Sequence, residues 1–140
     1  MIDLKIYFKE LLLRTQQRRE LIDITLDVEK VVRESSISNG LCLIFVPHAT
    51  AAIVLNEHER GLLNDIMRKI SEMYPDNGGW DHNRIDDNAA AHLASTFIGP
   101  ATFMPVKEGK LIRGTWQNIF LVELDGPRPT RKVVVEVIGE

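Results

Sequence analysis

The sequence predicts an α+β protein with antiparallel or mixed β-sheets, arranged like a β-sandwich, and about three helices packed against them. Strand-like segments lie near both ends of the chain, and helical patterns lie between them. Strands and helices do not alternate regularly, which argues against a doubly wound parallel fold. The length of 140 residues is typical of one domain, so we expect residues 1–140 to fold as a single unit.

The first part of the chain predicts a β-hairpin. Apolar and polar residues are mixed along residues 4–14, a polar turn follows at residues 16–19, and residues 20–24 are a second strand-like run. A helix is the alternative for the first run, because residues 11–13 are three leucines and leucine is a good helix former.

A helix is predicted next, from Thr25 as its N-cap to about Ser35. Its apolar stripe has helical spacing and consists of Val28, Val31 and Val32. The continuous apolar run at residues 41–46 predicts a strand that is covered on both faces, and residues 51–55 predict a second strand joined to it.

The middle of the chain predicts two helices separated by a long loop. Residues 57–72 are amphipathic with helical spacing, whereas residues 73–87 contain proline, glycine and asparagine and little apolar periodicity. A short helix from residue 87 or 88 to about Phe97 ends at Gly99. The remainder predicts four strands, at residues 101–106, 111–113, 117–124 and 132–138.

Composition and charge exclude several classes of protein. The net charge is -3 and the basic residues are scattered, so we expect no nucleic-acid partner. No segment is long and apolar enough to span a bilayer, and the N-terminus lacks a signal-peptide pattern, so we expect a cytoplasmic protein with no membrane partner. Cys42, the only cysteine, lies in an apolar run and is expected to be a core residue rather than a nucleophile.

Three of the four histidines, His48, His82 and His92, lie in short polar motifs. Imidazole is the commonest metal ligand at neutral pH, and three imidazoles with one open position form a catalytic zinc site. No pair has the spacing that places two ligands on one helix face, so only the fold can bring them together. The alternative is three separate histidines, each hydrogen-bonded at the end of an element. His58 lies in a charged stretch and is expected to be solvated.

Carboxylates and amides lie close to these motifs in the sequence. Glu57 opens a predicted helix, where it is either a general base near a metal or an acid favoured by the helix dipole. Asp81 or Asp86 orients the second nitrogen of a ligating histidine, or serves only as a cap or turn residue. We assign catalytic roles to Glu57, Asp86 and Asn88.

A planar or phosphorylated ligand is suggested by Thr115, Trp116 and Gln117, although Trp116 is equally consistent with a core aromatic residue. Arg128, which lies between two prolines, either clamps a phosphate or carboxylate or forms a surface ion pair. The expected substrate-binding residues are Thr50, Asn56, Thr115, Trp116, Gln117 and Arg128. The sequence contains neither a glycine-rich phosphate loop nor the Gly-x-Ser-x-Gly motif of serine hydrolases.

Taken together and in order, these motifs resemble the YjbQ-like family over essentially the whole chain. The motifs are Pro-His-Ala-Thr-Ala-Ala at residues 47–52, Asn-Glu at 56–57, Asp-His-Asn at 81–83, Asp-Asn-Ala-Ala-Ala-His-Leu at 87–93, Gly-Pro at 99–100, Gly-Thr-Trp-Gln at 114–117 and Asp-Gly-Pro-Arg at 125–128. The chain departs from the family at Ala49 and Ala90, where more polar residues are usual.

The resemblance implies a homotrimer with pockets near subunit interfaces, and a metal-binding pocket formed by His48, His82 and His92. It also implies a secondary thiamine-phosphate synthase, which joins an aminopyrimidine diphosphate to a thiazole phosphate and releases diphosphate. Diphosphate departure is usually assisted by magnesium, whereas imidazoles favour zinc or another transition metal, so we expect this activity to be weak or secondary. The alternatives are a zinc-type hydrolase of a small phosphorylated or carbonyl metabolite, and a non-catalytic trimeric ligand-binding module.

Overall fold

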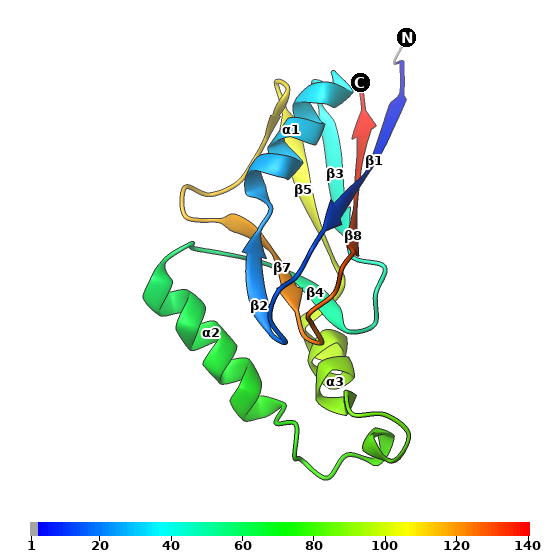
Figure 1. Cartoon of the computed structure of the whole chain (residues 1–140). Coiled ribbons are helices and arrows are strands. Elements are labelled where there is room, and N and C mark those ends of the chain that lie inside the picture. Colours follow the sequence, from blue (N-terminus) through cyan, green and yellow to red (C-terminus); the bar gives the residue numbers. More distant parts are fainter. Residues whose placement is uncertain (1–2) are drawn as a thin grey trace.

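The computed structural model describes residues 3–140 and confirms an α+β fold with two antiparallel sheets and three α-helices (Figure 1). The five-stranded sheet has the order β1 (Lys5–Leu13), β8 (Arg131–Gly139), β3 (Gly40–Phe45), β5 (Ala101–Lys107) and β6 (Lys110–Leu111). The three-stranded sheet has the order β2 (Glu20–Asp23), β7 (Asn118–Glu123) and β4 (Ala51–Asn56). The helices are α1 (Thr25–Ser35), α2 (Arg60–Met73) and α3 (Ala89–Ile98), with a short 3₁₀ helix, η1, at Asp81–Arg84.

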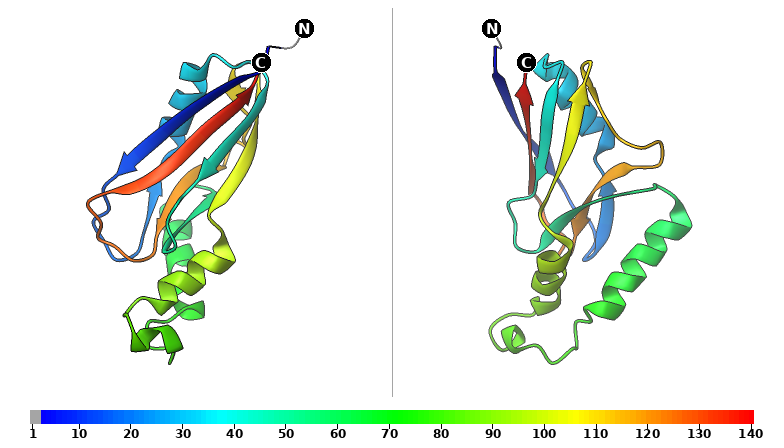
Figure 2. Two further views of the ribbon diagram at one scale, coloured as in Figure 1. Left: turned by 90° about the vertical axis from the view of Figure 1, so that its right-hand side faces the viewer. Right: turned by 180° about the vertical axis from the view of Figure 1, so that it is seen from behind.

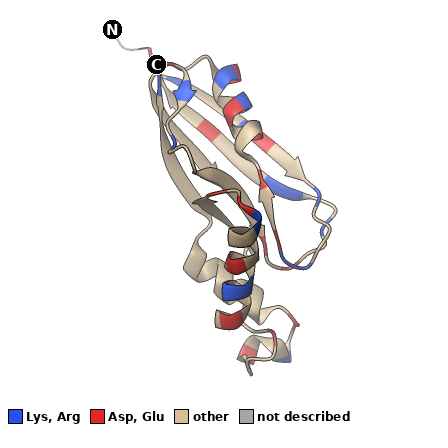
Figure 3. Ribbon diagram, turned by 90° about the vertical axis from the view of Figure 1, so that its left-hand side faces the viewer, with Lys and Arg blue, Asp and Glu red and all other residues tan. Residues whose placement is uncertain are grey.

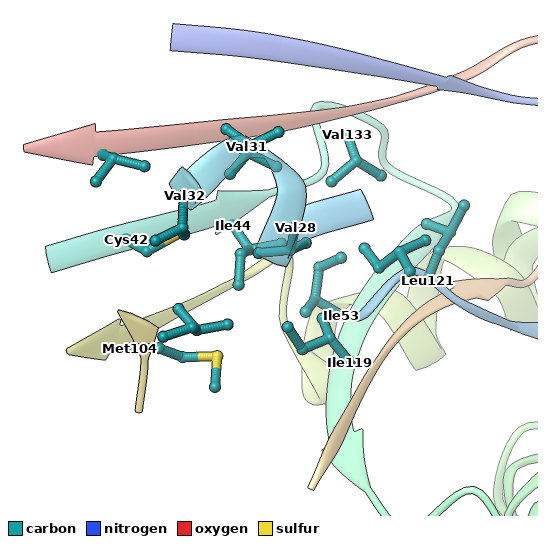
Figure 4. Close-up of a cluster of buried hydrophobic side chains, with 14 of the residues drawn as sticks. Val28, Val31, Val32, Cys42, Ile44, Ile53, Met104, Ile119, Leu121 and Val133 are labelled. Atoms are coloured by element: carbon teal, nitrogen blue, oxygen red, sulfur yellow. The ribbon is translucent and has the colours of Figure 1, made fainter. Parts of the chain in front are cut away.

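The main core lies between the two sheets and α1. The predicted stripe of Val28, Val31 and Val32 is fully buried and packs against the inner face of the five-stranded sheet (Figure 4). Alternate residues of β8 point into the same core, and Ile53, Ile119 and Leu121 enter it from the three-stranded sheet. Helical spacing on α1 and twofold alternation on the strands therefore bury one face of each element.

A second, smaller core lies on the opposite face of the three-stranded sheet, where α2 and α3 pack. Ala52 and Val122 from the sheet contact Ala91 and Ala94 of α3, and Ile70 of α2 joins them. Alanines lack long side chains, so α3 can approach β4 closely. This contact fixes the position of α3, which carries His92.

The predicted β-hairpin is wrong, although both of its strands exist. β1 pairs antiparallel with β8, and β2 pairs antiparallel with β7, so the two strands lie in different sheets. The connection between them hydrogen-bonds to the turn at residues 125–128, since Thr15 N donates to Arg128 O at 2.9 Å and Gly126 N donates to Arg18 O at 2.8 Å. Each of the two strands therefore pairs with a strand from the C-terminal part of the chain and not with its neighbour in the sequence.

The strand at residues 41–46 is confirmed with small changes in its ends, but it is not covered on both faces. Cys42 and Ile44 face the core, whereas Leu41 is 47% exposed on the outer face of the five-stranded sheet. Figure 2 shows this sheet with β1, β8, β3 and β5 side by side and no helix over its outer face. The strands at residues 41–46 and 51–55 also belong to different sheets.

The helix predictions are confirmed within a few residues, with two differences at their beginnings. Thr25 is the first residue of α1 rather than its cap, and Asp23 Oδ1 accepts from Thr25 N at 2.9 Å. Glu59 caps α2 by accepting from Gly61 N and Leu62 N. None of the helices among residues 3–140 is both long and apolar enough to cross a membrane.

Candidate functional site

His82 and His92 lie together at the edge of a cavity. Their ring centroids are 4.8 Å apart, and the ring planes meet at 74°. The cavity has a volume of about 410 Å³ and is lined by Trp80, Asp81, His82, Ala89, His92 and Leu93. The structure therefore brings together two of the three predicted metal-binding histidines, which the sequence places on different elements.

The loop between α2 and α3 holds the two histidines in this position through side-chain contacts to its own backbone. Trp80 Nε1 donates to Pro75 O at 2.8 Å, which fixes the start of η1. Asn83 Oδ1 accepts from Ala89 N at 3.1 Å and so satisfies a free amide at the start of α3. Asn83 thereby connects the 3₁₀ helix that carries His82 to the helix that carries His92.

His48 does not join this pair. Its Nε2 accepts a hydrogen bond from Lys132 N at 2.9 Å, at the beginning of β8. Burial lowers the pKa of His48, and the positive charges of Arg131 and Arg128 lower it further, while the carboxylate of Glu123 acts in the opposite direction. Within residues 3–140, no three histidine, cysteine or carboxylate side chains are placed to hold a metal together. The three-histidine centre stays a prediction.

The predicted catalytic residues Asp86 and Asn88 both lie close to the histidine pair. A backbone hydrogen bond from Asp87 N lowers the pKa of Asp86, and the nearby imidazoles of His82 and His92 act in the same direction. Asn88 is 8% exposed and lies one turn before His92 on α3. Its Nδ2 donates to Asp125 Oδ2 at 2.9 Å, while its Oδ1 is buried with no hydrogen-bond partner among the described residues.

Arg128 belongs to a small basic pocket next to this region. Arg128 and Arg14 line a pocket of about 230 Å³ together with Thr15, Pro127 and Pro129. Arg128 Nη2 donates to Asp125 Oδ2 at 2.9 Å, the same oxygen that Asn88 contacts. Asp125 thus orients both side chains. The two roles predicted for Arg128 therefore occur together. Arg128 forms an ion pair with Asp125, and its guanidinium group also lines a pocket.

Thr50 lies between His48 and the core. Arg131 Nη2 donates to Thr50 Oγ1 at 2.9 Å and to Thr50 O at 3.1 Å, and Thr50 is 7% exposed. These contacts use the hydroxyl for structure, so Thr50 stabilises the loop that carries His48.

We call His48, Thr50, His82, Asp86, Asn88, His92 and Arg128 the β7-end group, because they gather beyond the Glu123 end of β7.

The remaining predicted substrate-binding residues lie at the other end of β7. Asn56 pairs with Asn118 in the register of β4 and β7, whereas Ala51, next to Thr50, pairs with Glu123. Six residues of extended strand separate these ends by roughly 17 Å. We call Asn56, Glu57, Thr115, Trp116 and Gln117 the β7-start group.

Two side chains of the β7-start group form hydrogen bonds to the backbone of their own turns. Asn56 Oδ1 accepts from Glu57 N at 2.8 Å, and Gln117 Oε1 accepts from Gly114 N at 2.7 Å. Trp116 is 70% exposed, which excludes the core alternative for this residue within the single chain. Glu57 is half-buried and precedes the cap of α2. One predicted site is therefore divided into two groups.

Sequence reasoning missed a contact between His58 and Asp23. His58 Nδ1 lies 2.6 Å from Asp23 Oδ2, and Asn118 Nδ2 donates to the same oxygen at 2.7 Å. His58 is exposed, as the sequence predicted, and it contacts Asp23 in addition. No local signal identifies this pair, because the two residues are separated by 35 positions and meet only when β2 and β4 flank β7.

Charges elsewhere are interspersed. Along α2, Lys and Arg alternate with Asp and Glu (Figure 3), and Arg68 forms ion pairs with Asp65 at 3.6 Å and with Glu72 at 3.9 Å. Such exposed pairs contribute little to stability. No single-sign surface develops on this helix, as expected from the scattered basic residues in the sequence.

Comparisons with known proteins extend over nearly the whole chain. A sequence model of the family described as UPF0047 protein YjbQ-like matches residues 9–140. The UPF0047 protein of Archaeoglobus fulgidus is 47% identical over 129 residues, which cover 92% of this chain and 99% of that protein. The UPF0047 protein YugU of Bacillus subtilis is 39% identical over 135 residues, which cover 94% of this chain and 98% of that protein.

Solved structures agree with the sequence relatives. A crystal structure of a YbjQ-like protein of unknown function from Sulfolobus solfataricus P2 has a TM-score of 0.98 and 58% identity, and covers 99% of this chain and 100% of that one. A hypothetical protein from Aeropyrum pernix K1 has a TM-score of 0.92 and 41% identity, over 95% of this chain and 98% of that one. The chain therefore belongs to the UPF0047, or YjbQ-like, family.

Proposed function

We propose that this protein is a metal-dependent enzyme that acts on a small phosphorylated metabolite at the β7-end group. The observation that supports this most directly is the pair of imidazoles, His82 and His92, at the edge of a 410 Å³ cavity. Imidazole pairs favour zinc or a neighbouring transition metal over magnesium. When bound, such a metal supplies Lewis acidity and lowers the pKa of a coordinated water.

His82 and His92 would hold this metal, and His48 is the proposed third ligand. The Nε2 atom of His48 is occupied by Lys132 N, so its free nitrogen is Nδ1. Since His48 lies apart from the pair within one chain, we propose that a neighbouring copy supplies it. The site would then be complete only in the assembled protein.

The residues around the pair provide for an anionic substrate. Arg128 and Arg14 line the adjacent basic pocket, and two guanidinium groups suit a phosphate. Asp86 lies close enough to both imidazoles for their charges to lower its pKa, so it would orient or polarise them. Asn88 Oδ1, which has no hydrogen-bond partner among residues 3–140, would accept a hydrogen bond from a substrate donor.

For the reaction itself, the family resemblance favours a weak thiamine-phosphate synthase activity that joins an aminopyrimidine diphosphate to a thiazole phosphate. The second candidate is hydrolysis of a small phosphorylated or carbonyl metabolite. The imidazole pair favours this candidate, because transition metals held by histidines are well suited to activating water. In both reactions Arg128 would bind the anionic group.

A homotrimer is the assembly that we propose for this enzyme. The outer face of the five-stranded sheet exposes apolar side chains that adjoin in register, among them Ile6, Phe8, Leu12, Leu41, Phe103 and Ile138. An apolar face of this kind marks an interaction site. We also propose a cytoplasmic location, where disulfides are rare, because the one cysteine, Cys42, is buried and the chain has no internal disulfide.

The decisive experiment measures metal in protein purified without a histidine tag. The wild type is expected to hold a transition metal, and His82→Ala, His92→Ala and His48→Ala should each lower its occupancy sharply while melting temperatures stay close to that of the wild type. His58→Asn is the matched control, because it also removes an imidazole but should leave the metal content unchanged. Full occupancy in all three alanine variants would refute the shared centre.

Activity assays then separate the reactions. The metal-loaded protein and the metal-free protein are incubated with the two thiamine precursors, and separately with a panel of phosphate esters. Formation of thiamine phosphate supports the synthase, whereas metal-dependent release of inorganic phosphate supports the hydrolase. Metal binding without turnover of any substrate would favour the ligand-binding module.

A further inference from the structure

Trp116 is a large aromatic residue that the proposed metal site leaves without a role. It is 70% exposed, yet the turn that carries it is held in one shape. Gln117 N donates to Gly114 O at 3.0 Å, and Gly114 N donates to Gln117 Oε1 at 2.7 Å. Arg113 Nη1 also donates to Gln117 O at 2.9 Å. The indole is therefore presented to solvent on a well-supported turn.

The 410 Å³ cavity beside the histidine pair has the chemistry that an indole requires. Trp80, Ala89 and Leu93 give it an apolar wall. Because Trp80 Nε1 donates to Pro75 O at 2.8 Å, Trp80 contributes only its ring to this wall. Asp81 also lines the cavity, and its side chain is 92% exposed and supplies an acceptor. A buried indole needs such an acceptor for its N–H group.

Trp116 does not reach this cavity within its own chain. Asn118, two residues after Trp116, pairs with Asn56 at one end of β7, whereas the start of α3 is tied to the other end through the hydrogen bond from Asn88 to Asp125. Figure 1 likewise shows the segment before β7 away from η1 and α3. Only a second copy of the chain can bring an indole from this turn to the cavity.

Exposed apolar side chains accompany both the indole and the cavity. Apart from the outer face of the five-stranded sheet and the segment before β1, the large exposed apolar residues within residues 3–140 fall into two patches. One lies around the turn before β7, and the other around the cavity: Leu26, Ile112 and Trp116 in the first, and Met73, Ile85 and Phe97 in the second. A contact between unlike patches of two copies covers both, and its repetition closes a ring.

We propose that Trp116 of a neighbouring copy inserts into the cavity beside His82 and His92. Its ring packs on the apolar wall, and its N–H group donates to Asp81. The inserted indole keeps water from one side of the histidine pair, so the candidate site is incomplete in a single chain. This inference rests on the homotrimer proposed above, but it requires neither the metal nor a particular reaction.

Tryptophan fluorescence tests the insertion directly, because the chain contains only Trp80 and Trp116. In full-length Trp80→Phe, the emission of Trp116 should be shifted to the blue and protected from acrylamide. Adding Leu93→Asp should restore the emission of an indole in water, since a charge on the apolar wall disfavours the buried ring. Adding Lys30→Glu, on the exposed side of α1, is the charge control and should change nothing.

Sedimentation of the same samples makes the outcomes distinct. A trimer in which Trp116 emits as in water would overturn the insertion and leave the assembly intact. Burial of Trp116 that Leu93→Asp does not change would place the indole in a different contact and would also overturn it. A wild-type monomer would refute both the assembly and the insertion, whereas absence of a metal would bear only on the proposed reaction.

Free indole provides a second test, in which it replaces the missing side chain. Trp116→Ala should bind indole in calorimetry, whereas the wild type, whose cavity is already filled, should not. Trp116→Ala combined with Leu93→Asp is the control and should not bind. Equal affinity of the wild type and Trp116→Ala for indole would show that the cavity is open to small molecules, which contradicts the proposal.

Cross-linking identifies the copies that meet, and it keeps both Trp116 and Leu93 in place. Thr115→Cys and Phe97→Cys in one chain put a thiol next to the indole and another one turn after Leu93 on α3. A short bismaleimide should join different copies into covalent dimers and trimers, and either cysteine alone should give none. Cys42 is buried and should not interfere. Failure of the double variant to cross-link would contradict the contact.

Discussion

Arg131 and Glu123 form a fully buried ion pair that joins the two sheets. Arg131 Nη2 lies 2.5 Å from Glu123 Oε2, and Arg131 Nε donates to Glu123 Oε1 at 2.9 Å. Their side chains are only 4% and 0% exposed. Thr15 Oγ1 also donates to Glu123 Oε1 at 2.7 Å. Since Glu123 ends β7 and Arg131 begins β8, the pair fixes the region that carries Thr50 and His48.

Glu123→Gln should lower the free energy of unfolding by about 3–5 kcal/mol, because it leaves the Arg131 guanidinium buried without a counter-charge. Urea unfolding followed by circular dichroism measures this. Glu72→Gln is the control, since its carboxylate is exposed and makes only weak ion pairs at 3.9 Å, and the change should stay within about 0.5 kcal/mol. A similar small effect at Glu123 would show that the ion pair contributes little.

Asp23 should make stability depend on pH below about pH 4. Because hydrogen bonds lower its folded-state pKa from 3.8 to about 2, the folded protein binds this proton less readily than the unfolded chain does. The stabilisation is complete above the unfolded pKa and is lost as the pH falls towards 2. It amounts to something on the order of 2 kcal/mol.

The test compares Asp23→Asn with the wild type by urea unfolding at several pH values. The variant should be less stable near pH 7, and the difference should shrink between pH 4 and pH 2. A difference that is constant over this range would contradict the role of the ionised carboxylate. His58→Asn should retain most of the pH dependence, because the contacts from Thr25 and Asn118 remain.

Charges introduced on the outer face of the five-stranded sheet should dissociate the proposed homotrimer. Phe8 and Phe103 are 53% and 66% exposed, and both lie in one row of side chains across β1, β8, β3 and β5. Phe8→Glu and Phe103→Glu should each convert a trimer into monomers in sedimentation velocity at micromolar concentration. Lys30→Glu, on the exposed side of α1, is the charge control. A wild-type monomer at this concentration would refute the assembly.

Glu57 and Arg128 should affect different kinetic constants once a substrate is found. A general base acts on the chemical step, so Glu57→Gln should lower kcat by about a hundredfold or more with little change in KM. An anchoring arginine acts mainly on binding, so Arg128→Ala should chiefly raise KM. If Glu57 only favours its helix dipole and Arg128 only braces its turn, both variants will keep their kinetics and lose a little stability.

The separation of these two residues adds a test by subunit mixing. Glu57 lies in the β7-start group and Arg128 in the β7-end group, so within one chain they sit at opposite ends of the three-stranded sheet. If they serve one site, they must come from different copies. Mixing Glu57→Gln subunits with Arg128→Ala subunits should then give more activity at low substrate concentration than either variant shows alone, and no such gain would assign them to separate sites.

The sequence by itself determined the elements and their buried faces. The spacing of Val28, Val31 and Val32 predicted α1, because a period of 3.6 residues places these side chains on one side of a helix. Twofold alternation likewise predicted β8, whose Val133, Val135 and Val137 are fully buried. The histidines near element ends were also recognisable, since loops and helix starts display polar side chains.

Only the tertiary structure decided which of these elements meet. β1 and β2 pair with β8 and β7 instead of each other, because strand pairing depends on which faces are buried together and not on nearness in the sequence. The same holds for the histidines. His82 on η1 packs against His92 on α3, and His48 accepts a hydrogen bond from the backbone of β8. His58 contacts Asp23, which is 35 positions away in the sequence. The periodicity of apolar residues depends on neighbours within a few positions of the chain, so it predicts single elements. Contacts between elements depend on how the whole fold packs, so the sequence pattern does not reveal them.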